Sequence, residues 1–348
     1  MNVRICFLLI YLATALTTQA QEVVIPHNEL EIGGTLVVPD HASSSSLVIM
    51  LSGSGAQNRD SEVVGFKIFA DVADHFKSLG IASFRFDDRG VASSTGSFTE
   101  ASLNDLAGDV HRIMDYFRAS DNHTYTSFIL MGHSQGGMVA VRAAQNRTDI
   151  ERLLLIASPM VPLKEIINEQ IRTIQSAMGN PEEDIQKTLA FQDKMYEAIR
   201  TDSGWDDVQN AFVELLKDQV SKLPEAQRNS IPDVDALAVA QYNAQMRPMQ
   251  SRQMATLLFY DVQADLKNLN IPMHAVFGEK DTQVSTGQNA TVFDSVCAEN
   301  QLTCSNATIP SANHLFQEAK TGMIQEYAML PKELMPAFLA ELAEVLKR

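Results

Sequence analysis

Residues 132–136 read Gly-His-Ser-Gln-Gly, a G-x-S-x-G pattern between two stretches of different character. Residues 128–131 have the length and branching of a buried strand, and residues 137–144 have the composition of a helix. A sharp turn from strand to helix exposes the hydroxyl of its serine and places the next N–H at a helix start. This context predicts that Ser134 is a nucleophile, although the pattern alone also fits a plain turn.

A nucleophilic serine needs a base, because its hydroxyl reacts poorly at neutral pH. If the chain order is serine, acid, base, the base lies on a late loop. His314 follows the last expected strand, where a loop can reach back over Ser134. The other seven histidines lie on N-terminal loops, expected helices, a polar turn, a strand start or beside Ser134 itself. We therefore expect His314 to take the proton from Ser134.

An acid that orients the histidine should leave the strand before it. Asp281 stands just after the expected strand 273–277, and Glu279 is the alternative. Glu279 lies two residues nearer the strand and should reach the imidazole less freely. The acid holds the histidine tautomer and stabilises the imidazolium. We expect Asp281 in this role.

An oxyanion hole requires two N–H groups near the serine. Gln135, the residue after the nucleophile, should supply one of them. The loop 52–56 should supply the other, from Ser54, with Gly53 and Gly55 left open. The loop does not match a dinucleotide fingerprint, because Asn58 holds the position of the third glycine.

The composition limits the partners and cofactors. There are 27 Lys and Arg against 43 Asp and Glu, a net charge of −16, which argues against nucleic acid and anionic membrane. No H-E-x-x-H motif occurs, so we expect no metal and no cofactor. Cys297 and Cys304 should form a disulfide that closes a loop before a late strand, although two free buried thiols are the alternative.

The first twenty residues predict export. A charged start, a short apolar run and the Thr18-Gln19-Ala20 site make a secretory signal peptide over 1–20, with an uncleaved anchor as the alternative. No later segment reaches the ~18 apolar residues that a membrane helix needs, so we expect no integral membrane span. The mature chain should reach the periplasm or the medium.

Strands and helices alternate along most of the chain. We expect strands near 31–39, 46–51, 82–86, 127–131 and 153–156, and helices over 66–79 and 103–117. This alternation predicts βαβ units and an α/β fold with a mostly parallel central sheet flanked by helices. The corresponding catalytic domain would comprise 21–162 and 256–348.

Residues 163–255 show helical periodicity only, which predicts an inserted all-helical cap over the carboxyl edge of the sheet. The sheet should then resume at 273–277 and 305–309, before a C-terminal helix from Pro331. Apolar residues near the end of the cap fit an acyl pocket or, equally well, the core of the cap. They are Met246, Met249, Met254, Leu257 and Phe259.

Five segments together carry a family resemblance: 53–60, 84–90, the turn 132–137, 278–281 and 313–316. With these segments the chain resembles the α/β-hydrolases, and among them bacterial esterases and serine-aminopeptidase-like hydrolases with a helical cap. The resemblance covers about residue 30 to the C-terminus without the cap. It implies a triad of Ser134, Asp281 and His314.

The resemblance also implies that the 87–90 loop supports the site, since Asp88 and Arg89 look suited to a buried ion pair. Two positions depart from the family pattern. Ser52 stands where many relatives have histidine, and Ala56 where close ones have proline.

These observations predict an exported serine hydrolase that cleaves carboxylic esters of short to medium acyl chain through an acyl-enzyme. An aminopeptidase or a thioesterase with the same triad is the alternative. A non-catalytic binding protein on a hydrolase scaffold would be expected to lack a triad residue. The expected partner is a small-molecule ester, and the oligomeric state is left open.

Overall fold

The computed structural model describes residues 20–27, 29–42, 44–120 and 125–347. Apart from Ala20, the expected signal peptide lies outside these residues. An eight-stranded sheet has the order β1-β2-β6-β3-β7-β8-β9-β10. Its strands are β1 Gln21–His27, β2 Leu30–Val37, β6 Ala82–Phe86, β3 Ser46–Leu51, β7 Ser127–His133, β8 Ile150–Ile156, β9 Met273–Gly278 and β10 Cys304–Ile309. The β1–β2 and β2–β6 pairs are antiparallel and the others parallel, which confirms the mostly parallel sheet.

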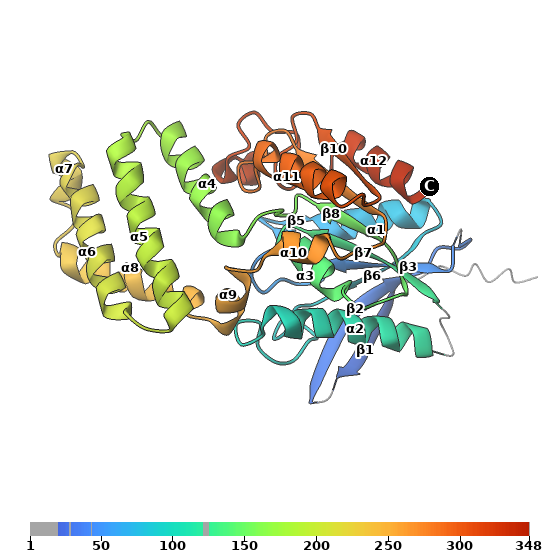
Figure 1. Ribbon diagram of the computed structural model, residues 1–348. Helices are drawn as coiled ribbons and strands as arrows, with labels where there is room; N and C mark the ends of the chain where they lie inside the picture. The colour runs from blue at the N-terminus through green and yellow to red at the C-terminus, as the bar shows by residue number, and fades with distance from the viewer. Residues whose placement is uncertain (1–19, 28, 43, 121–124, 348) are drawn as a thin grey trace, which may run out of the picture.

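Helices cover both faces of this sheet (Figure 1). One face carries α2 (Leu103–Ala119), α3 (Gln135–Ala143) and α11 (Thr286–Glu299), and the other carries α1 (Ile68–Ser78) and α12 (Pro336–Lys347). All six residues of β3 and of β9 are buried and most of them are apolar, because both faces of these strands are covered. The sheet therefore holds the carboxyl ends of its central strands in a rigid frame.

The segment between β8 and β9 contains only helices. They are α4 Leu163–Ala177, α5 Glu182–Thr201, α6 Trp205–Ser221, α7 Glu225–Arg228, α8 Val234–Met249, α9 Arg252–Leu257 and α10 Val262–Leu266. Figure 1 shows α5, α6, α7 and α8 as a bundle that projects from the side of the sheet. The bundle has an apolar core of its own, including Phe191, Met195 and Phe212. The last helix, α10, packs against α3 instead.

Several elements differ from the sequence expectation, among them the short strands β4 (Glu62–Val63) and β5 (Phe66–Lys67), which precede helix α1. Strand β1 and helix α11 were not foreseen, and the C-terminal helix begins at Pro336 rather than Pro331. Pro331 does not start the helix: residues 331–335 are irregular with a bend, and the Pro331 carbonyl accepts from the Gln317 side chain. Pro336 is the first helical residue, where the fixed φ of proline suits the turn and its missing N–H costs nothing.

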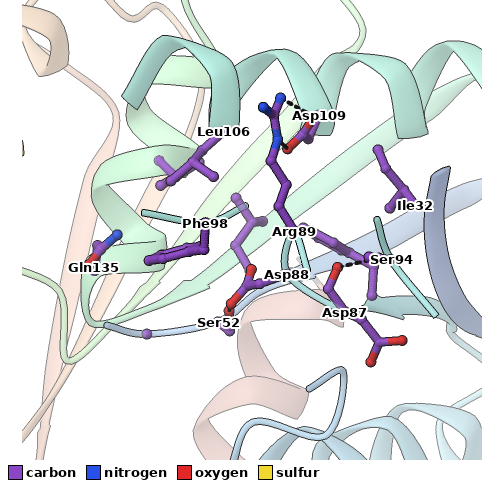
Figure 2. Close-up of a pocket in the computed structure, with 15 residues that line it drawn as sticks. Ile32, Ser52, Asp87, Asp88, Arg89, Ser94, Phe98, Leu106, Asp109 and Gln135 are labelled. Atoms are coloured by element: carbon purple, nitrogen blue, oxygen red, sulfur yellow. Dashed lines mark hydrogen bonds and ion pairs between the residues drawn. The ribbon is translucent and has the colours of Figure 1, made fainter. Parts of the chain in front are cut away.

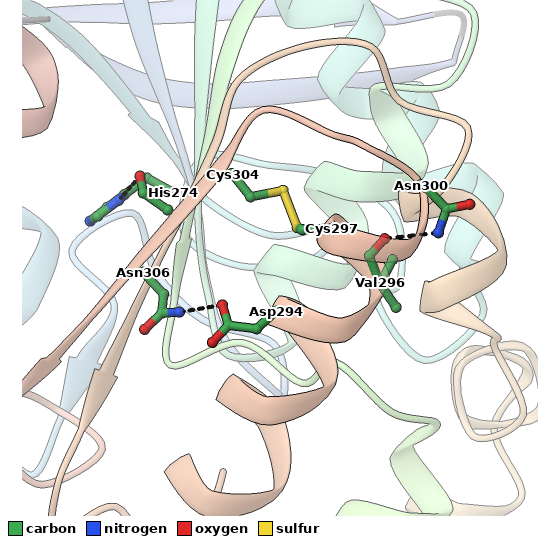
Figure 3. Close-up of a disulfide and its surroundings, with 8 residues drawn as sticks. His274, Asp294, Val296, Cys297, Asn300, Cys304 and Asn306 are labelled. Carbon is green, nitrogen blue, oxygen red and sulfur yellow. Dashed lines mark hydrogen bonds between the residues drawn. A yellow bond between two sulfur atoms is a disulfide. The ribbon is translucent and has the colours of Figure 1, made fainter.

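A disulfide joins Cys297, near the end of α11, to Cys304, the first residue of β10 (Figure 3). It closes the connection before the last strand, as the sequence predicted. No helix in the described ranges is long and apolar enough to cross a bilayer.

Candidate active site

Ser134 lies at the turn between β7 and α3, with φ 53° and ψ −124°. A non-glycine residue at positive φ is uncommon and is held only by firm surroundings. Its N–H donates to the carbonyl of Ile156, 2.8 Å away. A Cβ at Gly132 would lie 2.3 Å from the Gly136 oxygen, and one at Gly136 would lie 2.2 Å from the Leu51 oxygen. The two glycines are therefore required for the sharp turn at Ser134.

Asp281 and His314 are hydrogen-bonded, with Nδ1 of the imidazole 2.7 Å from Oδ2 of the carboxylate. The N–H groups of Gln283 and Val284 donate to the other carboxylate oxygen at 2.8 Å each. Both side chains are buried. Since a carboxylate only accepts, Nδ1 carries the proton and Nε2 is left as an acceptor. Glu279 points elsewhere and accepts from the N–H of Ser311, so Asp281 is the acid that contacts the imidazole.

The loops that carry Asp281 and His314 are packed tightly together. A Cβ at Gly278 would lie 2.6 Å from the carbonyl oxygens of Ala312 and Asn313. The side-chain oxygen of Asn313, which is fully buried, accepts from the N–H groups of Leu315 and Gln317 and shapes the turn at His314. This arrangement leaves His314 little freedom to move away from Asp281.

Tyr327 supports the same loops from η1 (Ile324–Met329), a short 3-10 helix. Its hydroxyl accepts from the side chain of Gln283 at 3.0 Å, and burial raises the pKa of this phenol. Nothing in the sequence pattern indicated Tyr327, because it lies in a segment without periodicity.

His133 connects the Ser134 turn to the histidine loop. Its Nε2–H donates to the carbonyl oxygen of His314 at 3.0 Å, and the two rings are 4.8 Å apart between centroids. Burial, together with the nearby His314, lowers the pKa of His133 to about 3. His133 is therefore neutral at working pH and acts as a fixed hydrogen-bond donor. The sequence had indicated only its place beside the nucleophile.

The loop after β3 passes directly over the Ser134 turn. A Cβ at Gly53 would lie 3.4 Å from Cβ of Ser134 and 3.2 Å from Nδ1 of His133. Within the described ranges, the N–H groups of Ser54 and Gln135 donate no hydrogen bond. Gln135 is the first residue of α3, so its N–H has no partner inside the helix. The N–H groups of Gly53 and Gly55 donate none to the described residues either, so unused donors lie both on the loop and at the helix start that flank Ser134, and Gly53 and Gly55 stay the alternatives to Ser54.

The expected Asp88–Arg89 ion pair does not form (Figure 2). Arg89 instead binds Asp109 on α2, with Nε and Nη2 at 2.6 and 2.8 Å from the two carboxylate oxygens. The two side chains leave the segment after β6 in different directions, and Arg89 lies in the turn that follows it. Asp88 turns toward the loop after β3 and accepts from Ser52 Oγ and the N–H of Gln57.

A small internal cavity of about 30 Å³ lies behind the same loop. Ser52, Gly53, Asp88, Gln135 and Gly136 contribute to its wall, with apolar side chains such as Phe98 and Leu106 opposite (Figure 2). It therefore borders both the loop and the start of α3.

The residues assigned to an acyl pocket lie in the apolar cluster of the helical segment. Met246 is buried there, and Met249, Met254 and Phe259 pack against it. Leu257 belongs instead to the core beneath the sheet. These positions favour the alternative interpretation, that the residues form a core. None of them borders the cavity beside Gly53 and Gln135.

Among the residues that the structure describes, no group of three or more His, Cys, Asp or Glu side chains is arranged to hold a metal ion.

Comparison with known proteins places this site in a family. The family model described as serine aminopeptidase, S33, matches residues 65–317. The chain belongs to this family of α/β-hydrolases. The matched residues begin just before β5 and α1 and end three residues after His314, so they include all three residues of the expected triad.

Two relatives are esterases by name. Esterase EstD of Thermotoga maritima is 24% identical over 143 residues, which are 41% of this chain and 34% of that protein. Protein phosphatase methylesterase 1 of Candida albicans is 34% identical over 74 residues, 21% of this chain and 20% of that protein. The S33-family chain therefore matches about a third and a fifth of the lengths of these relatives.

Solved structures share the fold. An esterase of Pyrococcus furiosus superposes with a TM-score of 0.55 at 14% identity, covering 95% of this chain and 91% of that one. A proline iminopeptidase of Mycobacterium smegmatis gives 0.55 at 16% identity, covering 94% and 98%. At such identities the likeness concerns the fold alone, which is that of an α/β-hydrolase.

Proposed function

We propose that this protein is an exported serine hydrolase that cleaves carboxylic esters through an acyl-enzyme. The observation that carries the proposal is the buried Asp281–His314 hydrogen bond, whose histidine loop is bound by His133 beside the strained turn of Ser134. The two esterase relatives support an ester rather than another acyl substrate. Acyl chains of short to medium length remain our expectation.

In the proposed mechanism, Ser134 Oγ attacks the ester carbonyl while Nε2 of His314 accepts its proton. Asp281 keeps the proton on Nδ1 and stabilises the imidazolium, and His314 then protonates the departing alcohol. The N–H groups of Gln135 and Ser54 hold the oxyanion, since neither donates to another described residue. Water, activated by the same histidine, releases the acid.

The experiment uses the purified protein and p-nitrophenyl esters of increasing chain length. Turnover should require Ser134, so that Ser134→Ala abolishes it, and a fluorophosphonate probe should label the wild type but not the variant. Far-ultraviolet circular dichroism checks that the variant is folded. Ester turnover by folded Ser134→Ala would overturn the mechanism.

An aminopeptidase is the second candidate, because the family model carries that description. Aminoacyl p-nitroanilides, tested beside the ester series on the same preparation, separate the two. A higher kcat/KM on anilides with a free α-amino group than on any ester would favour the peptidase.

Export is tested separately. The signal peptide at 1–20 predicts that the mature protein isolated from a producing cell begins at Gln21. Edman sequencing of the extracytoplasmic fraction gives the answer, and a mature chain that still begins at Met1 would contradict export by cleavage.

A further inference from the structure

Asp88 is a buried carboxylate without a cation. It follows β6 and is 8% exposed, yet it forms no ion pair with any residue of the described chain. The neighbouring carboxylates are paired, Asp87 with Arg59 and Asp109 with Arg89. A buried charge is costly unless hydrogen bonds compensate for it. The hydrogen-bond partners of Asp88 therefore indicate the role of its carboxylate.

Those contacts hold both ends of one turn, residues 52–57, which follows β3. Oδ2 of Asp88 accepts from Oγ of Ser52 at 2.8 Å and from the N–H of Gln57 at 2.9 Å. The N–H of Asp88 donates to the carbonyl of Gln57 at 3.0 Å. Between Ser52 and Gln57 lie four residues, Gly-Ser-Gly-Ala, which include Ser54. The carboxylate thus closes the base of the turn that carries the proposed oxyanion donor.

The turn has few other restraints. Gly55 adopts φ +85°, and a Cβ there would meet no atom within 4 Å, so packing does not hold the tip. The side chain of Gln57 donates to the carbonyl of Ser54 at 2.9 Å, which carries the restraint from the base of the turn to Ser54. A cavity of about 30 Å³ borders Ser52 and Gly53, so the first end of the turn is not fully packed.

We propose that Asp88 is a positioning residue for ester hydrolysis, whose carboxylate acts through Ser52 and Gln57 to hold the Ser54 N–H where the oxyanion forms. This inference rests on the proposed function.

Ionisation of Asp88 should then modulate turnover. Burial raises the pKa of Asp88 to about 7, against the opposing effect of its two hydrogen bonds, and Asp109 and Asp87 add to the rise. A protonated carboxyl is a weaker acceptor than a carboxylate. The hydrogen bonds from Ser52 and Gln57 to Asp88 should therefore strengthen as the pH rises through neutrality.

Three variants separate this role from a merely structural one. Asp88→Ala removes the acceptor, and Asp88→Asn keeps an uncharged oxygen in its place. Ser52→Ala removes one of the two donors and leaves the carboxylate. The matched control is Asp149→Asn, a carboxylate 9% exposed at the start of β8, paired with Arg147 and Arg118 at the opposite end of the strands.

The measurements are kcat and KM on p-nitrophenyl butyrate at pH 5.5 and 8.5. Loss of an oxyanion donor costs about 10²–10³ in kcat, so displacing one should cost about ten- to a hundredfold in Asp88→Ala, with KM changed much less. Asp88→Asn should lie close to wild type at pH 5.5 and fall behind it at pH 8.5. Asp149→Asn should show no such dependence on pH.

The outcomes distinguish a failure of the proposed function from a failure of the proposed role of Asp88. If wild type does not hydrolyse esters in a Ser134-dependent way, the proposed function fails. If it does, but Asp88→Ala and Asp88→Asn match its kcat at both pH values, only the role of Asp88 is overturned. If Asp88→Ala does not fold, Ser52→Ala decides, with a several-fold loss of kcat expected and an unchanged kcat contradicting the proposal.

Discussion

The imidazole of His133 donates a hydrogen bond to the carbonyl oxygen of His314, 3.0 Å away. The residue before the proposed nucleophile thus restrains the backbone of the proposed base, across 181 residues of chain. Neither residue depends on the helical segment for this contact. It directly joins two motifs that lie far apart in the sequence.

The first prediction concerns this contact. His133→Leu should lower kcat about ten- to a hundredfold, because small displacements of a reacting group are costly. It should also destabilise the fold by about 1–3 kcal/mol, since the His314 carbonyl loses its donor. The control is His111→Leu, which removes a similar bond to the Ala143 carbonyl far from Ser134 and should leave kcat unchanged. Equal kcat values for the two variants would contradict the role of His133.

The second prediction separates the two candidate acids. Asp281→Asn should lower kcat by about 10⁴-fold, because an amide favours the wrong histidine tautomer. Glu279→Gln should change kcat by less than about threefold, since its carboxylate contacts the Ser311 N–H rather than the imidazole. Steady-state kinetics with p-nitrophenyl butyrate measure both. A greater loss in Glu279→Gln would reverse the assignment.

The third prediction contrasts two glycines by chemical denaturation. Gly136→Ala should destabilise the protein by about 3 kcal/mol or more, because its Cβ would lie 2.2 Å from a backbone oxygen. Gly108→Ala, inside α2 with nothing within 4 Å of the new Cβ, should stabilise it by about 0.5–1 kcal/mol. If both substitutions changed the free energy of unfolding in the same direction, the surroundings assigned to one of the two glycines would be wrong.

The fourth prediction concerns the disulfide. Replacing Cys297 and Cys304 with alanine should lower the free energy of unfolding by about 2–3 kcal/mol, because the short closed loop restricts the unfolded chain. Activity of the folded variant should be retained, since the bond lies at the β10 start, away from Ser134. A loss of kcat at a temperature where the variant is fully folded would contradict the expected retention of activity.

The fifth prediction concerns stability and pH. The pKa of Asp88 is about 7 in the folded state against 3.8 as its ordinary value. At a pH between these two pKa values, Asp88 keeps its proton in the folded protein and loses it in the unfolded chain. The contribution of Asp88 to stability therefore falls as the pH rises from about 4 to about 7. Asp88→Asn removes the effect. The stability of the variant relative to wild type should therefore increase over that range, and parallel pH curves would contradict the shift.

Much of the fold followed from local pattern. Strands β3 and β6 have the boundaries that the sequence predicted; β3 is buried along its whole length and leaves a nearly continuous hydrophobic run in the sequence. Helix α11 gave no such signal, since its first turn reads Thr-Gly-Gln-Asn and its apolar residues lie mostly in its second half. The start of α12 was misjudged because two prolines, Pro331 and Pro336, both fit a helix start.

The sequence also could not show where the residues assigned to the acyl pocket lie within the helical segment. Its lack of strands was readable from periodicity, yet the position of Met246 and Phe259 was not. An apolar residue at helical spacing looks the same in a core as in a pocket, because both remove it from water. Only the packing of α5, α6 and α8 against one another separates the two.

The sequence by itself determined which residue types are available for the proposed chemistry: a serine on a glycine-flanked turn, with an aspartate and a histidine in the order that an α/β-hydrolase uses. Tertiary structure alone decided the partners of the charged groups. Arg89 binds Asp109 rather than its neighbour Asp88, and Asp88 binds the turn around Ser54. The reason is that a motif fixes residue types along the chain, whereas the direction of each side chain depends on the strand, helix and loop packed beside it.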